Sequence, residues 1–155
     1  MVAKNLLLFS GLIGLFWIWK SRMNKAQLIL ARTIYGEARG EGRKGMTAVA
    51  NVIINRAAIG GWWGDSIINV AQAPWQFSAW NANDPNRAII ENLMPGDNEI
   101  FDLAYLIAGD AMAGDTVDET KGATHYHTTA INPHWADPAK QVAQIGSHVF
   151  YRGIA

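Results

Sequence analysis

Apolar and polar positions along this chain change character near residue 23. Residues 5–19 (NLLLFSGLIGLFWIW) carry no charge, are apolar on every side, and have basic residues on both flanks. Fifteen helical residues at about 1.5 Å each reach roughly 22 Å, which is short of the ~30 Å hydrocarbon core of a bilayer. No small-residue cleavage pattern follows the segment. We therefore expect residues 1–22 to form an uncleaved N-terminal transmembrane anchor or signal-anchor.

From residue 23 onward the pattern is that of one folded domain. Apolar residues recur at i, i+3, i+4 and i+7, which predicts helices. We expect these helices and helical turns at residues 24–38, 43–58, 66–72, 86–93 and 98–112. Residues 123–128 and 147–152 are short runs of β-branched, His and aromatic residues that begin just after a glycine, and they predict two strands. The expected fold class is α+β and mainly α, with a small β-sheet or hairpin beside the helices.

Composition narrows the function classes. The absence of cysteine excludes disulfides, thiol nucleophiles and cysteine-ligated zinc. Thirteen basic and thirteen acidic side chains cancel, so no overall positive field attracts nucleic acid, and none is expected as a partner. Half of the 155 residues are hydrophobic, so the chain buries a core, and its length suits one domain with one site.

Glu37 is the candidate catalytic residue. It lies where the first soluble helix is expected to end, in a segment with glycines at 36, 40 and 42. A carboxyl group that is partly removed from water retains its proton near neutral pH, as a general acid requires. Position alone is weak support, because a glutamate near a helix end is more often a solvated surface charge. Glu41 lies between two arginines and is equally well explained as an ion-pair partner.

Tryptophans and histidines suggest two ligand chemistries. Five tryptophans outside the N-terminal segment exceed what one small core buries completely, and aromatic faces in a cleft stack on sugar rings. They are Trp62, Trp63, Trp75, Trp80 and Trp135. His125 and His127 alternate along a predicted strand. With His134 or His148 as a third ligand they would make a zinc hydrolase, although no H-E-x-x-H motif accompanies them.

Three blocks in this order resemble the catalytic domain of the spore cortex-lytic cell-wall hydrolases, a family that also occurs in bacteriophages. They are ARTIYGEARGEGRKGMTAVANVIINR at residues 31–56, QFSAWN at 76–81 and GATHYHTTAINPHWADPAKQVAQIGSHVFYR at 122–152. The resemblance implies a peptidoglycan glycosidase of lysozyme-like or lytic-transglycosylase-like fold over residues 23–155. Such an enzyme cuts the β-1,4 bond between N-acetylmuramic acid and N-acetylglucosamine.

The resemblance also implies roles for particular residues. The catalytic glutamate of the first block falls on Glu37. The expected substrate-binding residues are Gln76, Phe77, Ser78, Trp80, Tyr126 and His127. His127 departs from the second aromatic residue that is more usual at its position. No metal and no cofactor is implied.

The carboxylates favour one mechanism over another. Retaining and inverting glycosidases use a second carboxylate, yet the three blocks hold only Glu41 and Asp137 besides Glu37. A lytic transglycosylase needs none, since Glu37 would protonate the glycosidic oxygen and then activate the muramyl 6-hydroxyl, which closes a 1,6-anhydro ring. The alternatives are muramidase hydrolysis with help from Glu41, a His-ligated zinc amidase, and a non-catalytic peptidoglycan-binding protein of a virion or membrane.

Peptidoglycan lies outside the cytoplasmic membrane, and this constrains location. We expect a membrane-anchored protein whose catalytic domain is extracytoplasmic, on the periplasmic side, or a component of a phage virion. Basic residues after the segment outnumber those before it, which taken alone slightly favours a cytoplasmic domain. The two indications disagree.

Overall fold

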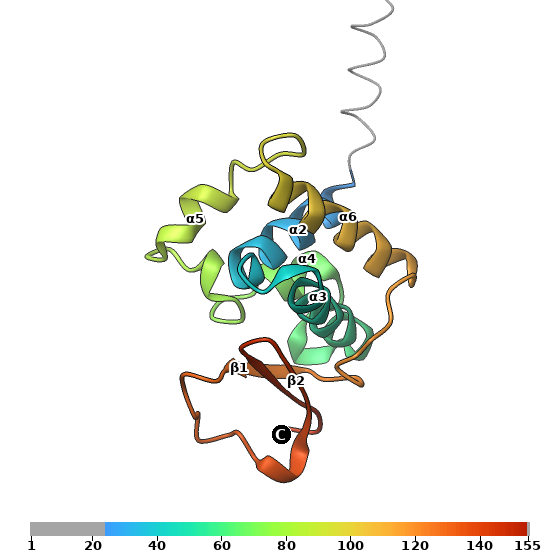
Figure 1. The fold of residues 1–155 in the computed structure, drawn as a ribbon, viewed down its shortest axis with the longest axis vertical. Helices are drawn as coiled ribbons and strands as arrows, with labels where there is room; N and C mark the ends of the chain where they lie inside the picture. The colour runs from blue at the N-terminus through green and yellow to red at the C-terminus, as the bar shows by residue number, and fades with distance from the viewer. Residues whose placement is uncertain (1–23, 155) are drawn as a thin grey trace, which may run out of the picture.

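The structure is a computed structural model that describes residues 24–154. Within this range, five α-helices and a three-stranded sheet form a mainly helical α+β domain, as predicted. Figure 1 shows the helices gathered together and the sheet set against one side of them, with the C-terminus at the sheet. The α-helices are α2 (Lys25–Ala38), α3 (Gly42–Ile59), α4 (Ile67–Gln72), α5 (Pro85–Ile90) and α6 (Glu99–Ala113). The short 3-10 turns are η1 (Gly61–Trp63), η2 (Ser78–Trp80) and η3 (Pro138–Lys140), and the strands are β1 (His125–Thr128), β2 (Gln141–Ile145) and β3 (His148–Tyr151).

Polar side chains set where the helices begin. The Asn24 side chain accepts hydrogen bonds from two backbone N–H groups at the start of α2, and Asn98 accepts one from the backbone of Phe101 at the start of α6. Ser66 does the same for α4. Such caps satisfy donors that have no partner within the helix. Each of the five predicted helical segments is confirmed, with ends that differ by up to three residues.

The core lies where α2, α3 and α6 meet. Leu30 and Ile34 of α2, Val49 of α3 and Phe101 and Ile107 of α6 are at most 1% exposed. Removing a side chain of this size from water contributes about 1.5–3 kcal/mol. These helices therefore form the rigid body on which the rest of the chain is arranged.

The sheet has one strand more than the sequence predicted. Its order is β1-β3-β2, both pairings are antiparallel, and the central strand β3 is buried along its whole length. The unpredicted strand β2 (QVAQI) is an edge strand with an irregular register between Gln141 and Ala143. Its polar and small residues remain partly exposed, so it carries little of the alternation that identifies a strand. Phe150 of β3 packs with Ala48 and Val52 of α3 and joins the sheet to the helices.

Helix α2 ends at Ala38, as predicted, so Gly36 and Glu37 lie inside its last turn. The predicted membrane segment, residues 1–22, lies outside the described residues. Within residues 24–154, every helix is too short or too polar to cross a bilayer.

Candidate active site

The Glu37 carboxylate is held by three hydrogen-bond donors. The Ala79 backbone N–H donates to Oε1 at 3.1 Å and the Ser78 hydroxyl donates to the same oxygen at 3.3 Å. The Tyr126 hydroxyl donates to Oε2 at 3.0 Å. Helix α2, turn η2 and strand β1 thus meet at one partly buried carboxylate, although these three elements come from separate parts of the sequence.

A glycine allows this meeting. A Cβ placed on Gly36 would lie 2.5 Å from the Cβ of Ala79, closer than two carbon atoms approach. Helix α2 and turn η2 can therefore lie against each other only because Gly36 has no side chain. The structure identifies Ala79 as the residue that approaches Gly36 most closely.

Tyr126 remains a donor at all physiological pH values. Burial and the neighbouring Glu37 charge raise the pKa of the Tyr126 hydroxyl well above its usual value of 10.0, although Arg56 acts in the opposite direction. The phenol therefore keeps its proton and directs it at Oε2. This hydroxyl is one of the predicted substrate-binding groups, and the structure places it directly on the candidate acid.

Arg56 is a buried cation near the Glu37 carboxylate. It was not among the residues predicted for the site. Its guanidinium donates to the Thr124 carbonyl at 2.7 Å and to Gln76 Oε1 at 3.1 Å. It lies over the Trp63 ring at 4.2 Å and the Phe77 ring at 5.1 Å. Burial lowers its pKa to about 10, so it stays charged at neutral pH. The sequence signal for this residue was an Arg at the C-terminal end of the apolar face of α3. An Arg at a buried position requires hydrogen-bond or ion-pair partners, which marks it as a possible site residue.

The predicted residues of the 76–81 block have different surroundings. Gln76 accepts a hydrogen bond from Arg56, and Ser78 donates one to Glu37. Phe77 is 1% exposed and packs in the core, so it anchors the 76–81 segment to the helices. The Trp80 indole donates from Nε1 to the Thr33 hydroxyl at 2.9 Å, which fixes the ring against α2.

His127 is turned away from the carboxylate. Neighbouring side chains on a strand point to opposite faces, and Tyr126 takes the face toward Glu37. His127 Nε2 instead lies 2.9 Å from the Tyr151 hydroxyl, and the two rings stack with centroids 5.3 Å apart. The structure therefore does not bring His127 to the site around Glu37, and its contact with substrate stays a prediction.

The histidines do not converge on a metal site. His148 contacts Tyr126, with ring centroids 5.1 Å apart, and so lies on the sheet face opposite to that of His125 and His127. Across residues 24–154, no three His, Asp or Glu side chains are grouped to hold a metal ion. The zinc hypothesis thus has no ligand set in the described part of the chain.

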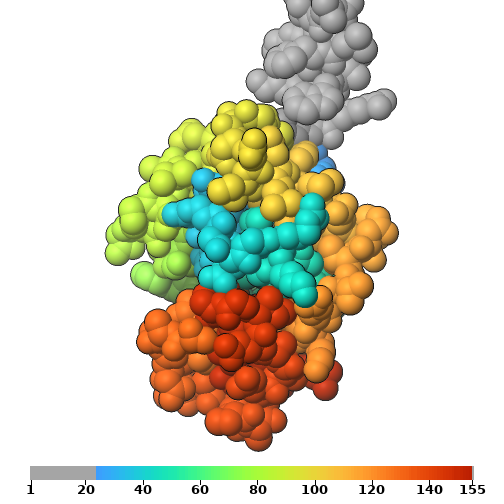
Figure 2. All heavy atoms as spheres, viewed as in Figure 1, coloured from blue at the N-terminus to red at the C-terminus, as the bar shows by residue number. Residues whose placement is uncertain are grey.

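Glu41 has a structural contact. Its carboxylate accepts from the Ser147 backbone N–H at 2.8 Å and from the Ser147 hydroxyl. These hydrogen bonds lower its pKa, so it is ionised at neutral pH. They join the loop before α3 to the β2–β3 turn, and Figure 2 shows the red C-terminal residues lying against the cyan residues of this region.

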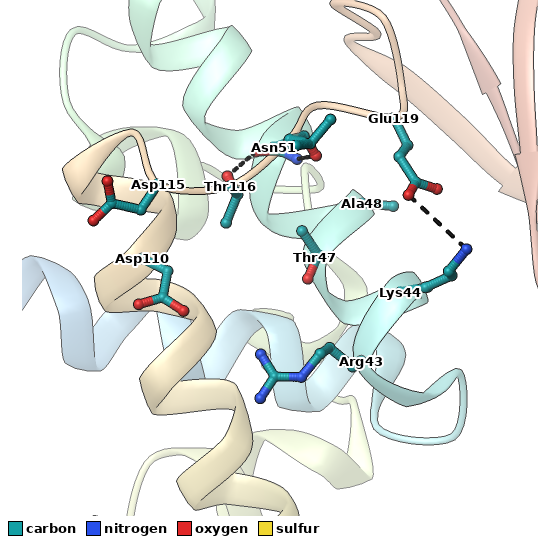
Figure 3. A pocket seen from close by; sticks show the side chains of 10 residues that line it. Arg43, Lys44, Thr47, Ala48, Asn51, Asp110, Asp115, Thr116 and Glu119 are labelled. Carbon is teal, nitrogen blue, oxygen red and sulfur yellow. Dashed lines mark hydrogen bonds and ion pairs between the residues drawn. The ribbon is translucent and has the colours of Figure 1, made fainter.

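A cavity of about 250 Å³ lies apart from these residues. It is formed between α3, α6 and the segment that follows α6 (Figure 3). Its lining contains Arg43 and Lys44 on α3 and three acidic side chains from α6 and beyond, at residues 110, 115 and 119. None of the predicted site residues lines it.

Comparison with known proteins gives the family. The sequence model of the family described as Cell Wall Hydrolase matches residues 40–151, and the chain belongs to this family. The matched segment begins three residues after Glu37. The place of Glu37 in the site therefore rests on the geometry described above.

Relatives of known name agree with this assignment. The chain is 30% identical over 127 residues to the spore cortex-lytic enzyme of Halalkalibacterium halodurans, which covers 79% of this chain and 33% of that protein. The chain thus spans about a third of the length of this curated relative. The fold is that of the catalytic domain of the Bacillus cereus SleB protein, with a TM-score of 0.64, 29% identity, and coverage of 83% of this chain and 91% of the other. The catalytic domain of the germination-specific lytic transglycosylase SleB from Bacillus anthracis matches with a TM-score of 0.64 and 26% identity, over 84% and 98% of the two chains.

Proposed function

We propose that this protein cleaves peptidoglycan glycan strands as a lytic transglycosylase, with Glu37 as the catalytic acid and base. The observation that carries the proposal is the hydrogen-bonding of Glu37 by Ser78, Ala79 and Tyr126. The bond cleaved is the β-1,4 bond between N-acetylmuramic acid and N-acetylglucosamine. The two SleB structures support this assignment, since one of them is named as a lytic transglycosylase.

The three donors suit a carboxyl group that gives up a proton. The Ala79 N–H can only donate, whereas the hydroxyls of Ser78 and Tyr126 both donate and accept. Protonated Glu37 directs its proton to the glycosidic oxygen, and all three donors then face the carboxylate that remains. Donors that are already in place where charge develops lower the barrier without reorganisation.

The second half of the reaction needs no further carboxylate. As the bond to the departing N-acetylglucosamine breaks, its O4 takes the Glu37 proton. The muramyl 6-hydroxyl oxygen bonds to C1, and its proton returns to Glu37, so no water is consumed. The nucleophile is part of the substrate, which removes most of the entropic cost of bringing it to the reacting carbon. Both oxygens of the Glu41 carboxylate accept hydrogen bonds from Ser147. Because these contacts occupy Glu41, they favour this route over a muramidase that uses Glu41 as its second carboxylate.

The test is Glu37→Gln, which keeps the shape of the side chain and removes its proton chemistry. Purified peptidoglycan is incubated with the wild type, with Glu37→Gln and with Glu99→Gln, a control at an exposed glutamate in the first turn of α6. We expect soluble muropeptides with 1,6-anhydro ends, identified by mass spectrometry, from the wild type and the control alone. Full activity of Glu37→Gln would overturn the proposal.

The other outcomes identify the alternatives. Products with reducing ends, heavier by one water, would identify a muramidase. Loss of activity on chelation of metal, with release of peptides, would identify a zinc amidase. Sedimentation of the wild type with peptidoglycan without any release of fragments would identify a binding protein.

A further inference from the structure

A groove of about 650 Å³ begins at Trp80. Trp80 is the last residue of η2, and the first two residues of that turn hold Glu37 Oε1. The groove and the candidate active site therefore share one short turn, which contributes residues to both. We call it the Trp75 groove, and its lining is Gln72, Pro74, Trp75, Trp80, Asn81, Ala82, Asn83, Arg87 and Glu91.

Trp75 has an unusual conformation and unusual exposure. Its φ is 66°, and it is one of two residues other than glycine in the described range with a positive φ. Residues with a side chain rarely adopt this conformation unless the surroundings or function require it. The Trp75 side chain is 81% exposed, so burial in the core does not explain its position. The strained backbone instead presents an indole ring to solvent at the edge of a groove.

The other wall of the groove is held rigidly. The Trp80 indole is bonded to Thr33, and the Trp80 carbonyl accepts from Arg87 at 3.2 Å. Arg87 is also paired with Glu91 at 2.7 Å. The charges in the groove therefore neutralise each other, and Asn81 and Asn83 add amide groups.

This combination suits one ligand class. Indole faces stack on the apolar faces of sugar rings, and amide groups bind hydroxyl and acetamido groups. The paired charges offer no net attraction to a free anion. We propose that the Trp75 groove is a glycan subsite, in which the ring of one N-acetylated sugar lies on Trp75 while a neighbouring part of the same β-1,4-linked strand lies at Glu37. The choice of ligand rests on the proposed function.

Binding is measured in the Glu37→Gln background, which separates it from turnover. Isothermal titration calorimetry of the full-length protein uses the β-1,4-linked tetrasaccharide of N-acetylglucosamine as the probe. We expect Trp75→Ala to raise the Kd about tenfold, which corresponds to the loss of about 1.4 kcal/mol, and Trp75→Phe to restore most of the affinity. The control is Leu106→Ala, because Leu106 is 52% exposed on α6 and does not line this groove.

A second variant distinguishes binding from a structural role. Glycine adopts a φ of 66° without strain, so we expect Trp75→Gly to unfold at the same urea concentration as the parent or a higher one, and to bind as weakly as Trp75→Ala. Equal affinity of Trp75→Ala and its parent, equal loss in Leu106→Ala, or no binding of the tetrasaccharide by the parent would overturn the subsite. Failure of the proposed function would appear separately, as activity in Glu37→Gln.

Discussion

The Tyr126 hydroxyl donates a hydrogen bond to Glu37 Oε2 across 3.0 Å, although the two residues are 89 positions apart in the sequence. One residue belongs to strand β1 and the other to the last turn of α2. The candidate acid therefore has its full set of donors only when the sheet is docked on the helices.

Replacing Tyr126 with Phe tests this hydrogen bond. The ring that packs against His148 and Phe150 is retained, while a donor to a charged group is lost. Such bonds contribute about 1.5–3 kcal/mol, so we expect kcat to fall about 10- to 100-fold and the free energy of unfolding to fall by no more than about 3 kcal/mol. Rates of muropeptide release and urea unfolding provide the two measurements. Tyr105→Phe on α6 is the matched control, and an equal loss of activity in that variant would contradict the assignment.

Replacing Arg56 with Lys tests the buried cation. A lysine keeps the charge but cannot reach both the Thr124 carbonyl and Gln76 while lying flat between Trp63 and Phe77. We expect the free energy of unfolding to fall by about 1–3 kcal/mol, since a buried acceptor loses its partner. Urea unfolding monitored by circular dichroism measures the change, and an unchanged midpoint would show that the planar guanidinium is not required.

Replacing Glu41 with Gln separates structure from mechanism. The carboxylate accepts from both donors of Ser147, and an amide offers a single acceptor oxygen. We expect stability to fall by about 1 kcal/mol and the folded variant to retain activity with anhydro products. Loss of activity in a folded Glu41→Gln protein would instead support a second catalytic carboxylate and hence the muramidase mechanism.

His125 predicts a dependence of stability on pH. Burial, and secondarily the charge of Arg56, lowers its pKa to about 4 from 6.5. In the unfolded chain His125 binds a proton below about pH 6.5, whereas in the folded chain it binds one only below about pH 4. The free energy of unfolding therefore falls as the pH decreases from 6.5 to 4. We expect His125→Asn to show a smaller loss between pH 7 and pH 4.5 in urea unfolding. An unchanged slope in the variant would contradict this role for His125.

The N-terminal segment gives a prediction about location. If residues 1–22 anchor the protein with the catalytic domain on the extracytoplasmic side, the chain will fractionate with membranes, and protease added to spheroplasts will digest the domain. Deleting residues 1–22 is expected to release the protein from the membrane fraction. A domain that stays protected in intact spheroplasts would contradict the orientation.

Helices were predictable because their signals are local. Asn24 and Asn98 cap α2 and α6 where the polar residue precedes an apolar repeat, and the repeats place the buried faces. Strand β2 was not predictable, because it pairs through its backbone at a sheet edge and its polar side chains stay partly in solvent. The glutamate was identifiable from its sequence block. Its three donors were not identified as such, since hydrogen-bond partners distant in sequence depend on how the elements pack.

The site residues show the same division. Ser78 and Tyr126 lie in the predicted blocks and contact Glu37, whereas His127 lies beside Tyr126 in sequence and faces the other way. Strand alternation accounts for this difference once the Tyr126 side chain is known to point toward Glu37. The burial of Arg56 and the strained, exposed conformation of Trp75 depend on packing and backbone geometry, which the sequence pattern does not define.

The close approach of Gly36 to Ala79 constrains how this protein can be redesigned. A larger residue at either position would separate the end of α2 from the 76–81 segment, and the Ala79 N–H and Ser78 hydroxyl would move away from the acid together. Chimeras with related hydrolases should therefore exchange residues 31–38 and 76–81 as a pair. A graft of one segment alone would place residues 36 and 79 from two different proteins in contact, and their side chains need not fit together.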